Sequence, residues 1–148
     1  MIRLSFYEYW NRLKFNLLGI LFGKNMKICN HIYVNGKGIV SIGNNFKFSS
    51  GSNINPISRN IRGSIIAVMK ESKIEIGDNV AISSACFWAK DHIIIGDNVN
   101  IGDNCLLMVN DAHPLYYRQR NPGYVNTVGY AQYQASILSK PIIIEDDV

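Results

Sequence analysis

The residue of this chain best suited to chemistry is His113, in the segment Asn110-Asp111-Ala112-His113-Pro114. An imidazole titrates near neutral pH, so it can take a proton from a hydroxyl group and later release it. Asp111 or Asn110 could hold the ring in one tautomer by hydrogen bonding, as an orienting residue does in other histidine-dependent acyl transfers. The segment therefore predicts a general base with an orienting partner among its neighbours.

His113 stands where a six-residue repeat would place an apolar residue. The repeat positions are Ile76, Ile82, Trp88, Ile95, Ile101 and Leu107, with one residue inserted between Trp88 and Ile95. The unit Ile-Gly-Asp-Asn-Val at 76–80 recurs at 95–99, and related units begin at 42, 101 and 144. A hexapeptide period is typical of a parallel β-helix. Three such units make one triangular coil, and Gly, Asp and Asn can turn its corners in left-handed backbone conformations.

The first and fifth positions of each unit are predicted to point inward. We expect Ile76, Ile82, Ile95, Ile101 and Leu107 to be buried, with Val80, Val99, Cys86 and Cys105 beside them. At such positions the two cysteines would be small hydrophobic groups of the core, not the exposed thiols that nucleophilic catalysis needs. Together with Cys29 they show no metal-binding spacing, which agrees with a reducing cytoplasm.

The predicted organisation is all-β with a helical cap. Residues 1–24 are expected to form an amphipathic helical cap, and 25–148 the β-helix. Within it we expect irregular early coils at 25–73, regular coils at 74–113, an extended loop at 114–140 and the start of a further coil at 141–148. The 34 residues from Ile42 to Ile76 are taken as two coils in imperfect register.

Two segments leave alternatives open. The N-terminal helix either caps the open end of the β-helix or anchors the protein at a membrane interface, since its apolar stretch is too short to span a bilayer. The loop contains five tyrosines with Arg118 and Arg120. Such residues suit recognition of a sugar or of a neighbouring subunit, and the alternative is a loop that only covers hydrophobic surface.

The repeat units, His113-Pro114, the long loop and Lys140-Pro141-Ile142-Ile143-Ile144 together resemble the hexapeptide-repeat O-acetyltransferases. The chain is similar to the maltose and galactoside acetyltransferase group and to sugar acetyltransferases of capsule and O-antigen clusters. The resemblance covers 73–148 well and the earlier residues loosely. It implies a left-handed β-helix, a homotrimer with active sites between subunits, acetyl-CoA as the donor, a saccharide as the acceptor, and His113 as the general base.

The resemblance also implies substrate contacts. Ser84 takes the place of an asparagine that contacts the acceptor in the galactoside enzyme, and Trp88, Tyr116 and Arg118 complete the predicted substrate-binding set. Val109 stands where the family often has an acidic residue, which leaves the residue that orients the ring open. The residues that bind coenzyme A are not identified.

Other functions fit the sequence less well. A carbonic anhydrase on this scaffold needs three zinc-binding histidines, whereas His92 and His113 are 21 positions apart, so no metal is expected and His31 and His92 are assigned to turns or the surface. A net charge of +4 without a dense basic cluster argues against nucleic-acid binding. We expect a cytoplasmic protein, at the inner face of the membrane if the helix is an anchor. Family members continue past the position of Val148, so the alternative function is that of a truncated, inactive β-helix acting as a binding module.

Overall fold

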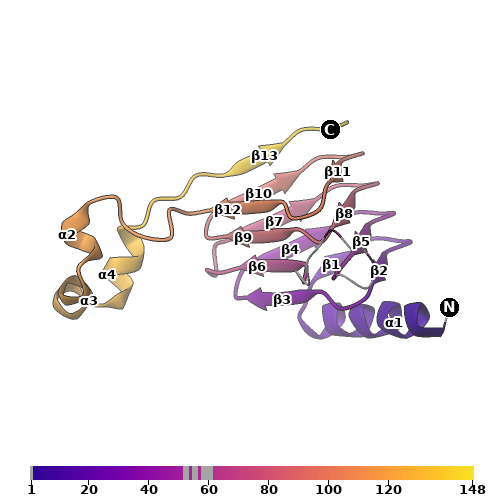
Figure 1. Ribbon diagram of the computed structural model, residues 1–148, viewed down its shortest axis with the longest axis horizontal. Helices are drawn as coiled ribbons and strands as arrows, with labels where there is room; N and C mark the ends of the chain where they lie inside the picture. The colour runs from indigo at the N-terminus through magenta and orange to yellow at the C-terminus, as the bar shows by residue number, and fades with distance from the viewer. Residues whose placement is uncertain (1, 52–53, 55–56, 58–61) are drawn as a thin grey trace.

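The computed structural model describes residues 2–51, 54, 57 and 62–148, and in it the chain winds through three parallel β-sheets (Figure 1). Sheet A contains, in order, β1 (Leu21–Phe22), β4 (Ile39–Ile42), β7 (Lys73–Ile76), β10 (His92–Ile95) and β13 (Ile142–Ile144). Sheet B contains β2 (Lys27–Cys29), β5 (Lys47–Ser49), β8 (Ala81–Ser83) and β11 (Asn100–Ile101). Sheet C contains β3 (Tyr33–Gly36), β6 (Ser64–Ala67), β9 (Cys86–Ala89) and β12 (Leu106–Val109). Each coil visits A, B and C in turn, which is the predicted left-handed parallel β-helix.

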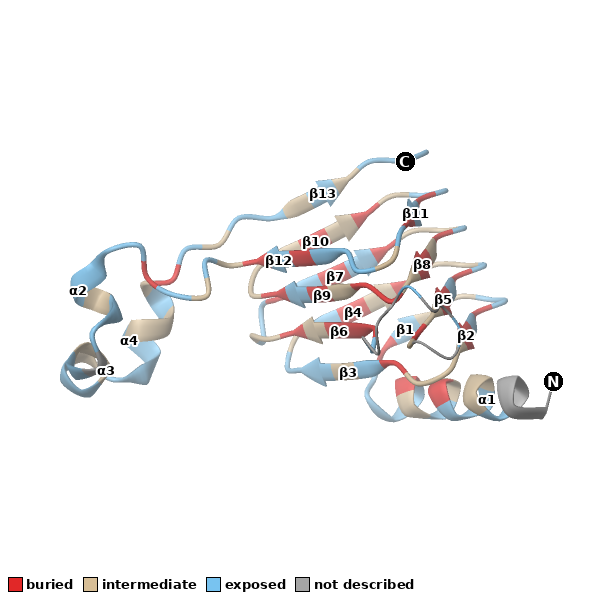
Figure 2. Ribbon diagram, viewed as in Figure 1, coloured by how far each residue is buried: buried red, intermediate tan, exposed pale blue. Residues whose placement is uncertain are grey.

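The core runs along the axis of the coils, and buried residues alternate with exposed ones along the strands (Figure 2). The side chains predicted to point inward are buried, namely Ile76, Ile82, Ile95, Ile101, Leu107, Val80 and Val99. Each of the five larger ones stacks on its counterpart or on a phenylalanine one coil away, because Ile76 is opposite Ile95, Ile82 opposite Ile101, and Phe87 opposite Leu107. The six-residue repeat is therefore confirmed as the source of the core.

Sheet C departs from the predicted register. Phe87 is fully buried there, and Trp88, which the repeat assigned to an inward position, is 39% exposed. The reason is that Ile82 and Phe87 are only five residues apart, whereas Ile101 and Leu107 are six apart. The prediction for Cys86 is wrong for the same reason, because Cys86 is half-buried on the outer face. Cys105 is not buried either, although its own coil keeps the six-residue step.

The early coils are more regular than predicted. Ile42 lies directly opposite Ile76, so the 34 residues between them form one coil and not two. The additional length lies between the end of β5 at Ser49 and the start of β6 at Ser64. An earlier corner unit, Phe22-Gly23-Lys24-Asn25-Met26, also went unrecognised in the sequence, although Phe22 pairs with Ile42 and Met26 is buried.

The corner between sheets A and B carries a column of stacked amide side chains. The fourth residue of every unit there adopts a left-handed backbone, with φ between 57° and 61°, and these residues are Asn25, Asn45, Asn79, Asn98 and Asp147. Each asparagine donates from Nδ2 to the Oδ1 of the next residue in the column, over distances of 2.8 to 3.0 Å. Asparagine tolerates this conformation better than most residues, so the corner selects it.

The glycines of these units have a different role from the one predicted. Gly43, Gly77 and Gly96 are not left-handed; they allow the next coil to approach. A Cβ on Gly77 would lie 2.3 Å from Asp97 Oδ1, and that carboxylate oxygen accepts a hydrogen bond from Asp78 N at 2.6 Å. Glycine at the second position therefore makes room for the acidic side chain that binds the backbone of the preceding coil.

Helix α1 (Ile2–Leu17) lies against the first coil at one end of the sheets (Figure 1). Asn11 Nδ2 donates to Asn30 O at 2.8 Å, Arg12 Nη2 donates to Met26 O at 2.5 Å, and Lys14 Nζ donates to Ile32 O. The helix thus supplies hydrogen-bond donors to carbonyl groups of the first coil, and it is the predicted cap. Among the described residues no helix has the length and apolar character needed to cross a bilayer.

We predict that Gly77→Ala destabilises the fold by about 1–3 kcal/mol, the usual cost of overpacking, because the new methyl group meets both Asp97 and backbone atoms of Gly96. Gly102→Ala is the matched control, since its Cβ would enter open space, and we expect its free energy of unfolding to change by less than about 0.5 kcal/mol. Urea unfolding followed by circular dichroism measures both. Equal stabilities of the two variants would contradict the proposed role of close coil approach.

Candidate functional site

The candidate site lies where the chain leaves the corner between sheets C and A. In the preceding coil this corner is short, because β9 ends at Ala89 and β10 begins at His92. In the next coil the chain departs after Asp111 and rejoins sheet A at Ile142, which lies opposite Ile93. The residues between form a helical lobe of α2 (Tyr117–Arg120), α3 (Pro122–Val128) and α4 (Tyr130–Ala135). The predicted loop 114–140 is therefore largely helical, and it stands beyond the ends of the sheets (Figure 1).

The sequence explains where these short helices begin and end. Asn121 caps α3, because its side-chain oxygen accepts a hydrogen bond from Gly123 N at 2.9 Å. Pro122 follows at the first helical position, where a missing N–H costs nothing. Gly129 then adopts a φ of 81°, which ends α3 and redirects the chain into α4. These three residues direct α4 back toward the turn that carries His113.

His113 follows a tight turn. Asn110 Oδ1 accepts a hydrogen bond from Ala112 N at 2.6 Å, and His113 N donates to Asp111 O at 2.6 Å. Between them Ala112 has a φ of 59°, a conformation that is costly for a residue with a Cβ. Backbone strain of this kind clusters at functional sites. The turn projects His113 to the surface, where the residue is exposed.

The imidazole of His113 contacts a residue of the lobe. Its Nδ1 lies 3.2 Å from Tyr133 Oη, within hydrogen-bonding distance. In the sequence Tyr133 is one of five loop tyrosines, and no sequence signal distinguishes it, because its position depends on how α4 folds back. The side chain of Asn110 is directed to Ala112 N, and Asp111 is exposed. An orienting role for either of these two residues stays a prediction.

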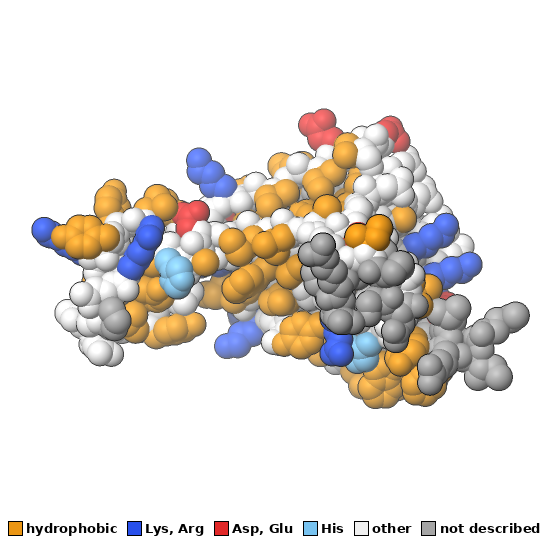
Figure 3. Space-filling view, in the orientation of Figure 1, with side chains coloured by type: hydrophobic (Ala, Val, Ile, Leu, Met, Phe, Trp, Pro, Cys, Tyr) orange, Lys and Arg blue, Asp and Glu red, His pale blue; other side chains and the backbone are white. Residues whose placement is uncertain are grey.

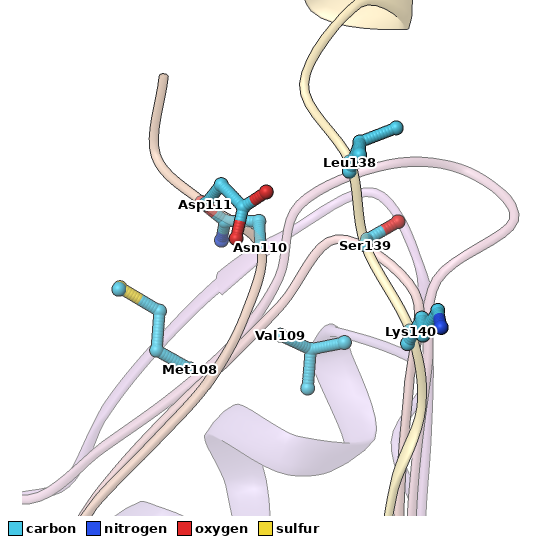
Figure 4. Close-up of a pocket in the computed structure, with 7 residues that line it drawn as sticks. All are labelled: Met108, Val109, Asn110, Asp111, Leu138, Ser139 and Lys140. Atoms are coloured by element: carbon cyan, nitrogen blue, oxygen red, sulfur yellow. The ribbon is translucent and has the colours of Figure 1, made fainter. Parts of the chain in front are cut away.

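An open pocket of about 320 Å³ lies beside this turn (Figure 4). Its two sides are the end of β12 with the turn that follows, and the returning segment 138–140; the lining residues are Met108, Val109, Asn110, Asp111, Leu138, Ser139 and Lys140. Asp111 N donates to Leu138 O at 3.1 Å, so the two sides are joined at the base. The lining thus includes one acidic and one basic side chain, Asp111 and Lys140, together with three apolar ones.

The predicted substrate-binding residues are not gathered around His113 within one chain. Ser84 is buried at the corner between sheets B and C, with a φ of 40°, and Gly51 N donates to its Oγ at 3.1 Å. Trp88 lies on the outer face of sheet C opposite Met108. Arg118 lies in α2 and Tyr116 directly precedes this helix, which is at the far side of the lobe from β9 (Figure 1). Their substrate contacts stay predictions.

A second pocket runs along the same corner of the β-helix, between its turns and α4. Its charged lining comes from Lys37, Lys70, Glu71 and Lys90, and Tyr130 of α4 also lines it. Lys90 joins the lobe to the β-helix, because its Nζ donates to Gln134 O and, at 2.7 Å, to Ile137 O. Burial lowers the pKa of Lys90 from its ordinary value. The exposed cations of this pocket are therefore those of Lys37 and Lys70.

The remaining titratable residues form no further centre in the part of the chain that is described, where no group of His, Cys, Asp and Glu side chains could hold a metal ion. His92 is half-buried on sheet A, with Nδ1 3.5 Å from Asp91 Oδ1. Burial, with Lys14 and Arg62 nearby, lowers the pKa of His31. Comparison of the chain with models of known protein families, with curated proteins and with solved structures finds no significant match.

We predict that Lys90→Met loosens the lobe without unfolding the β-helix, because the variant keeps the length of the side chain and loses both hydrogen bonds to the lobe. Amide hydrogen exchange should accelerate in residues 117–137 and stay slow in the strands. Lys73→Met is the control, since Lys73 is exposed on sheet A. Unchanged exchange of the lobe in Lys90→Met would show that other contacts hold it.

Proposed function

We propose that this chain transfers an acetyl group from acetyl-CoA to a hydroxyl group of a saccharide, with His113 as the general base. The observation that supports the proposal most directly is the position of His113. It is exposed at the only described break of the corner between sheets C and A, on a strained turn, with one ring nitrogen next to Tyr133 Oη and an open pocket beside it. A rigid scaffold that carries its chemistry on an inserted segment is a common arrangement in enzymes.

The proposed reaction follows from the two nitrogen atoms of the ring. If Nδ1 carries the ring proton and donates a hydrogen bond to Tyr133 Oη, the other ring nitrogen, Nε2, has a lone pair and can act as a base. Nε2 takes the proton of the acceptor hydroxyl while its oxygen attacks the thioester carbonyl carbon. The tetrahedral intermediate then collapses, the carbon–sulfur bond breaks, and the imidazolium returns the proton to the thiolate of coenzyme A. No acyl-enzyme forms, so no cysteine or serine nucleophile is needed.

The proposal includes a homotrimer in which neighbouring subunits complete each site. The outer face of sheet C carries exposed apolar side chains, namely Tyr33, Trp88, Leu106 and Met108, which Figure 3 shows as an orange band across the middle of the molecule. The lobe presents Tyr116, Tyr117 and Tyr130 to solvent. A lobe that packs against sheet C of the next subunit would bring Tyr116 and Arg118 near Trp88, which a single chain leaves apart.

For the donor, the phosphate groups of acetyl-CoA require cations. Lys37 and Lys70 lie in the pocket beside α4, at the same corner of the β-helix as His113. We assign the anionic end of acetyl-CoA to this pocket and the reacting thioester to the turn at His113. Ser84 is a less favourable acceptor contact, since it is buried and its hydroxyl already accepts a hydrogen bond from Gly51 N.

The first test is turnover of His113→Ala, measured as thiol release from acetyl-CoA with a panel of mono- and oligosaccharides. We expect a loss of roughly 10²–10⁴-fold, the usual contribution of a general base. His92→Ala is the control, because it removes an imidazole from sheet A and should keep full turnover. Retained turnover in His113→Ala, with an unchanged circular dichroism spectrum, would remove His113 from the mechanism. No turnover of the wild-type chain with any acceptor would favour the alternative, a β-helix that only binds a partner.

Tyr133→Phe tests how the imidazole is held. Loss of one hydrogen bond corresponds to ~0.5–1.5 kcal/mol, so we expect kcat to fall about 2- to 10-fold. The limb of the pH–rate profile that reports the histidine should also move, which a purely structural effect would not cause. Tyr124→Phe removes a hydroxyl from α3 and is the control. An unchanged pH profile in Tyr133→Phe would show that the hydroxyl does not act on His113.

A further inference from the structure

Helix α1 turns an apolar stripe toward solvent. Phe6, Trp10, Leu13 and Leu17 follow the spacing of one helix face, and they are 62%, 44%, 39% and 78% exposed. Leu18 and Leu21 extend the exposed apolar surface beyond the end of the helix. Figure 3 shows this surface as orange side chains at the lower edge of the molecule, where α1 lies in Figure 1. A contiguous exposed apolar surface of this kind marks an interaction site.

The orientation of the helix is the reverse of the usual one. In most surface helices the apolar stripe faces the core and the polar face meets water. Here the hydrogen bonds from Asn11, Arg12 and Lys14 direct the polar side chains to the first coil, and Phe15 is the large apolar residue that α1 buries among its described side chains. The apolar stripe therefore does not pack on the first coil, because the opposite face of α1 makes those contacts.

The part of the chain that contains α1 and the first coil is positively charged. Residues 1–50 contain seven Lys or Arg and a single acidic residue, Glu8, whereas the remaining 98 residues contain eight Lys or Arg and ten Asp or Glu. Lys24, Lys27 and Lys47 line one pocket with Arg12 and Glu8, alongside α1. The end of the molecule that carries α1 is therefore apolar and basic together, while the opposite end is weakly acidic.

We propose that α1 docks on the surface of an anionic membrane, with the stripe in the headgroup region and the lysines next to the lipid phosphates. An apolar helix face with basic neighbours is the chemistry of interfacial helices. Tyr9 and Trp10, both exposed on α1, are residue types enriched at membrane interfaces. A second copy of the chain is a poorer occupant, because stripe-to-stripe contact would bring two basic ends together. This inference goes beyond acetyl transfer and holds or fails independently of it.

The chain contains two tryptophans, and they give a direct test. In Trp88→Phe the remaining reporter, Trp10, lies on the stripe; in Trp10→Phe the remaining reporter, Trp88, lies on sheet C. Each is mixed with vesicles of two parts phosphatidylcholine to one part phosphatidylglycerol, and with vesicles of phosphatidylcholine alone. We expect the fluorescence of Trp10 to shift to shorter wavelength with the anionic vesicles, and less so at high salt. Trp88 should show no shift.

Sedimentation with the same vesicles tests the stripe itself. Leu17→Glu should lower the fraction of protein bound to vesicles by roughly tenfold or more. The variant loses a leucine that would be buried in the lipid, and it adds a negative charge next to anionic headgroups. Leu115→Glu is the matched control, since it makes the same change at an exposed leucine of the lobe, and it should bind like the wild type. Both residues are largely exposed, so both variants should keep the fold, which circular dichroism checks.

Three outcomes would overturn the proposal. The first is no shift of Trp10 with anionic vesicles. The second is a shift that appears without lipid and grows with protein concentration, which would assign the stripe to a second copy. The third is equal vesicle binding by Leu17→Glu and Leu115→Glu, which would leave the stripe without a role at the membrane.

Discussion

The fold depends on the close approach of successive coils at the corner between sheets A and B. At this corner the ladder of β-sheet hydrogen bonds is interrupted, and each backbone N–H still needs an acceptor. A side chain of the next coil provides it, as when Asp97 Oδ1 accepts from Asp78 N, and the approach is only close enough because Gly77 has no Cβ. Hydrogen bonds from the backbone and then the side chain of Asn44 lower the pKa of Asp78, so this carboxylate remains a charged acceptor near neutral pH. The column of Asn side chains fixes the same corner from outside.

This constraint determines where the chain can carry insertions. The corner between sheets A and B has the same length in every described coil, from Phe22–Met26 to Ile95–Val99. The two longer connections lie at the other two corners. One joins β5 to β6, between sheets B and C, and the other is the helical lobe between C and A. A lobe inserted there leaves the stacked corner and its hydrogen bonds in place. The chemistry proposed for His113 is therefore carried on an insertion that leaves the stacked scaffold unchanged.

The same constraint explains what the sequence could predict. The units that begin at Ile42, Ile76 and Ile95 were recognisable because the close coil approach favours glycine at the second position and the left-handed corner favours asparagine at the fourth. The unit at Ile144 has neither residue and was recognisable from its apolar ends and from the acidic residues between them. Sheet C has no such requirement, so a step of five residues from Ile82 to Phe87 passed unnoticed. Because of that one missing residue, Trp88 and Cys86 lie on the outer face and not in the predicted inward positions. Ser84 shows the same limit, because it occupies a left-handed corner position that Asn30 and Asn104 fill in other coils.

The candidate site was predictable in part. His113 was identifiable because a titratable residue interrupts an apolar repeat, which is a property of the sequence alone. Its partner Tyr133 was not, because 20 residues and three short helices separate them, and the direction of each helix depends on local caps such as Asn121 and Gly129. Hydrogen-bond partners that come from an inserted lobe have no period and no fixed spacing. Such partners become visible only in three dimensions.

Helix α1 shows a further limit of periodicity. An apolar stripe at helical spacing is normally assigned to the core, since burial of apolar surface is the dominant favourable term in folding. The end of a β-helix changes this preference, because its terminal coil, here the first, exposes carbonyl groups that need donors. Asn11, Arg12 and Lys14 meet this need only if the polar face is turned inward, at the cost of a pKa for Lys14 that burial and then the nearby charge of Arg62 lower to about 8. The apolar stripe is left outside as a consequence, so the hydrogen bonding that closes the fold also creates the surface available for docking.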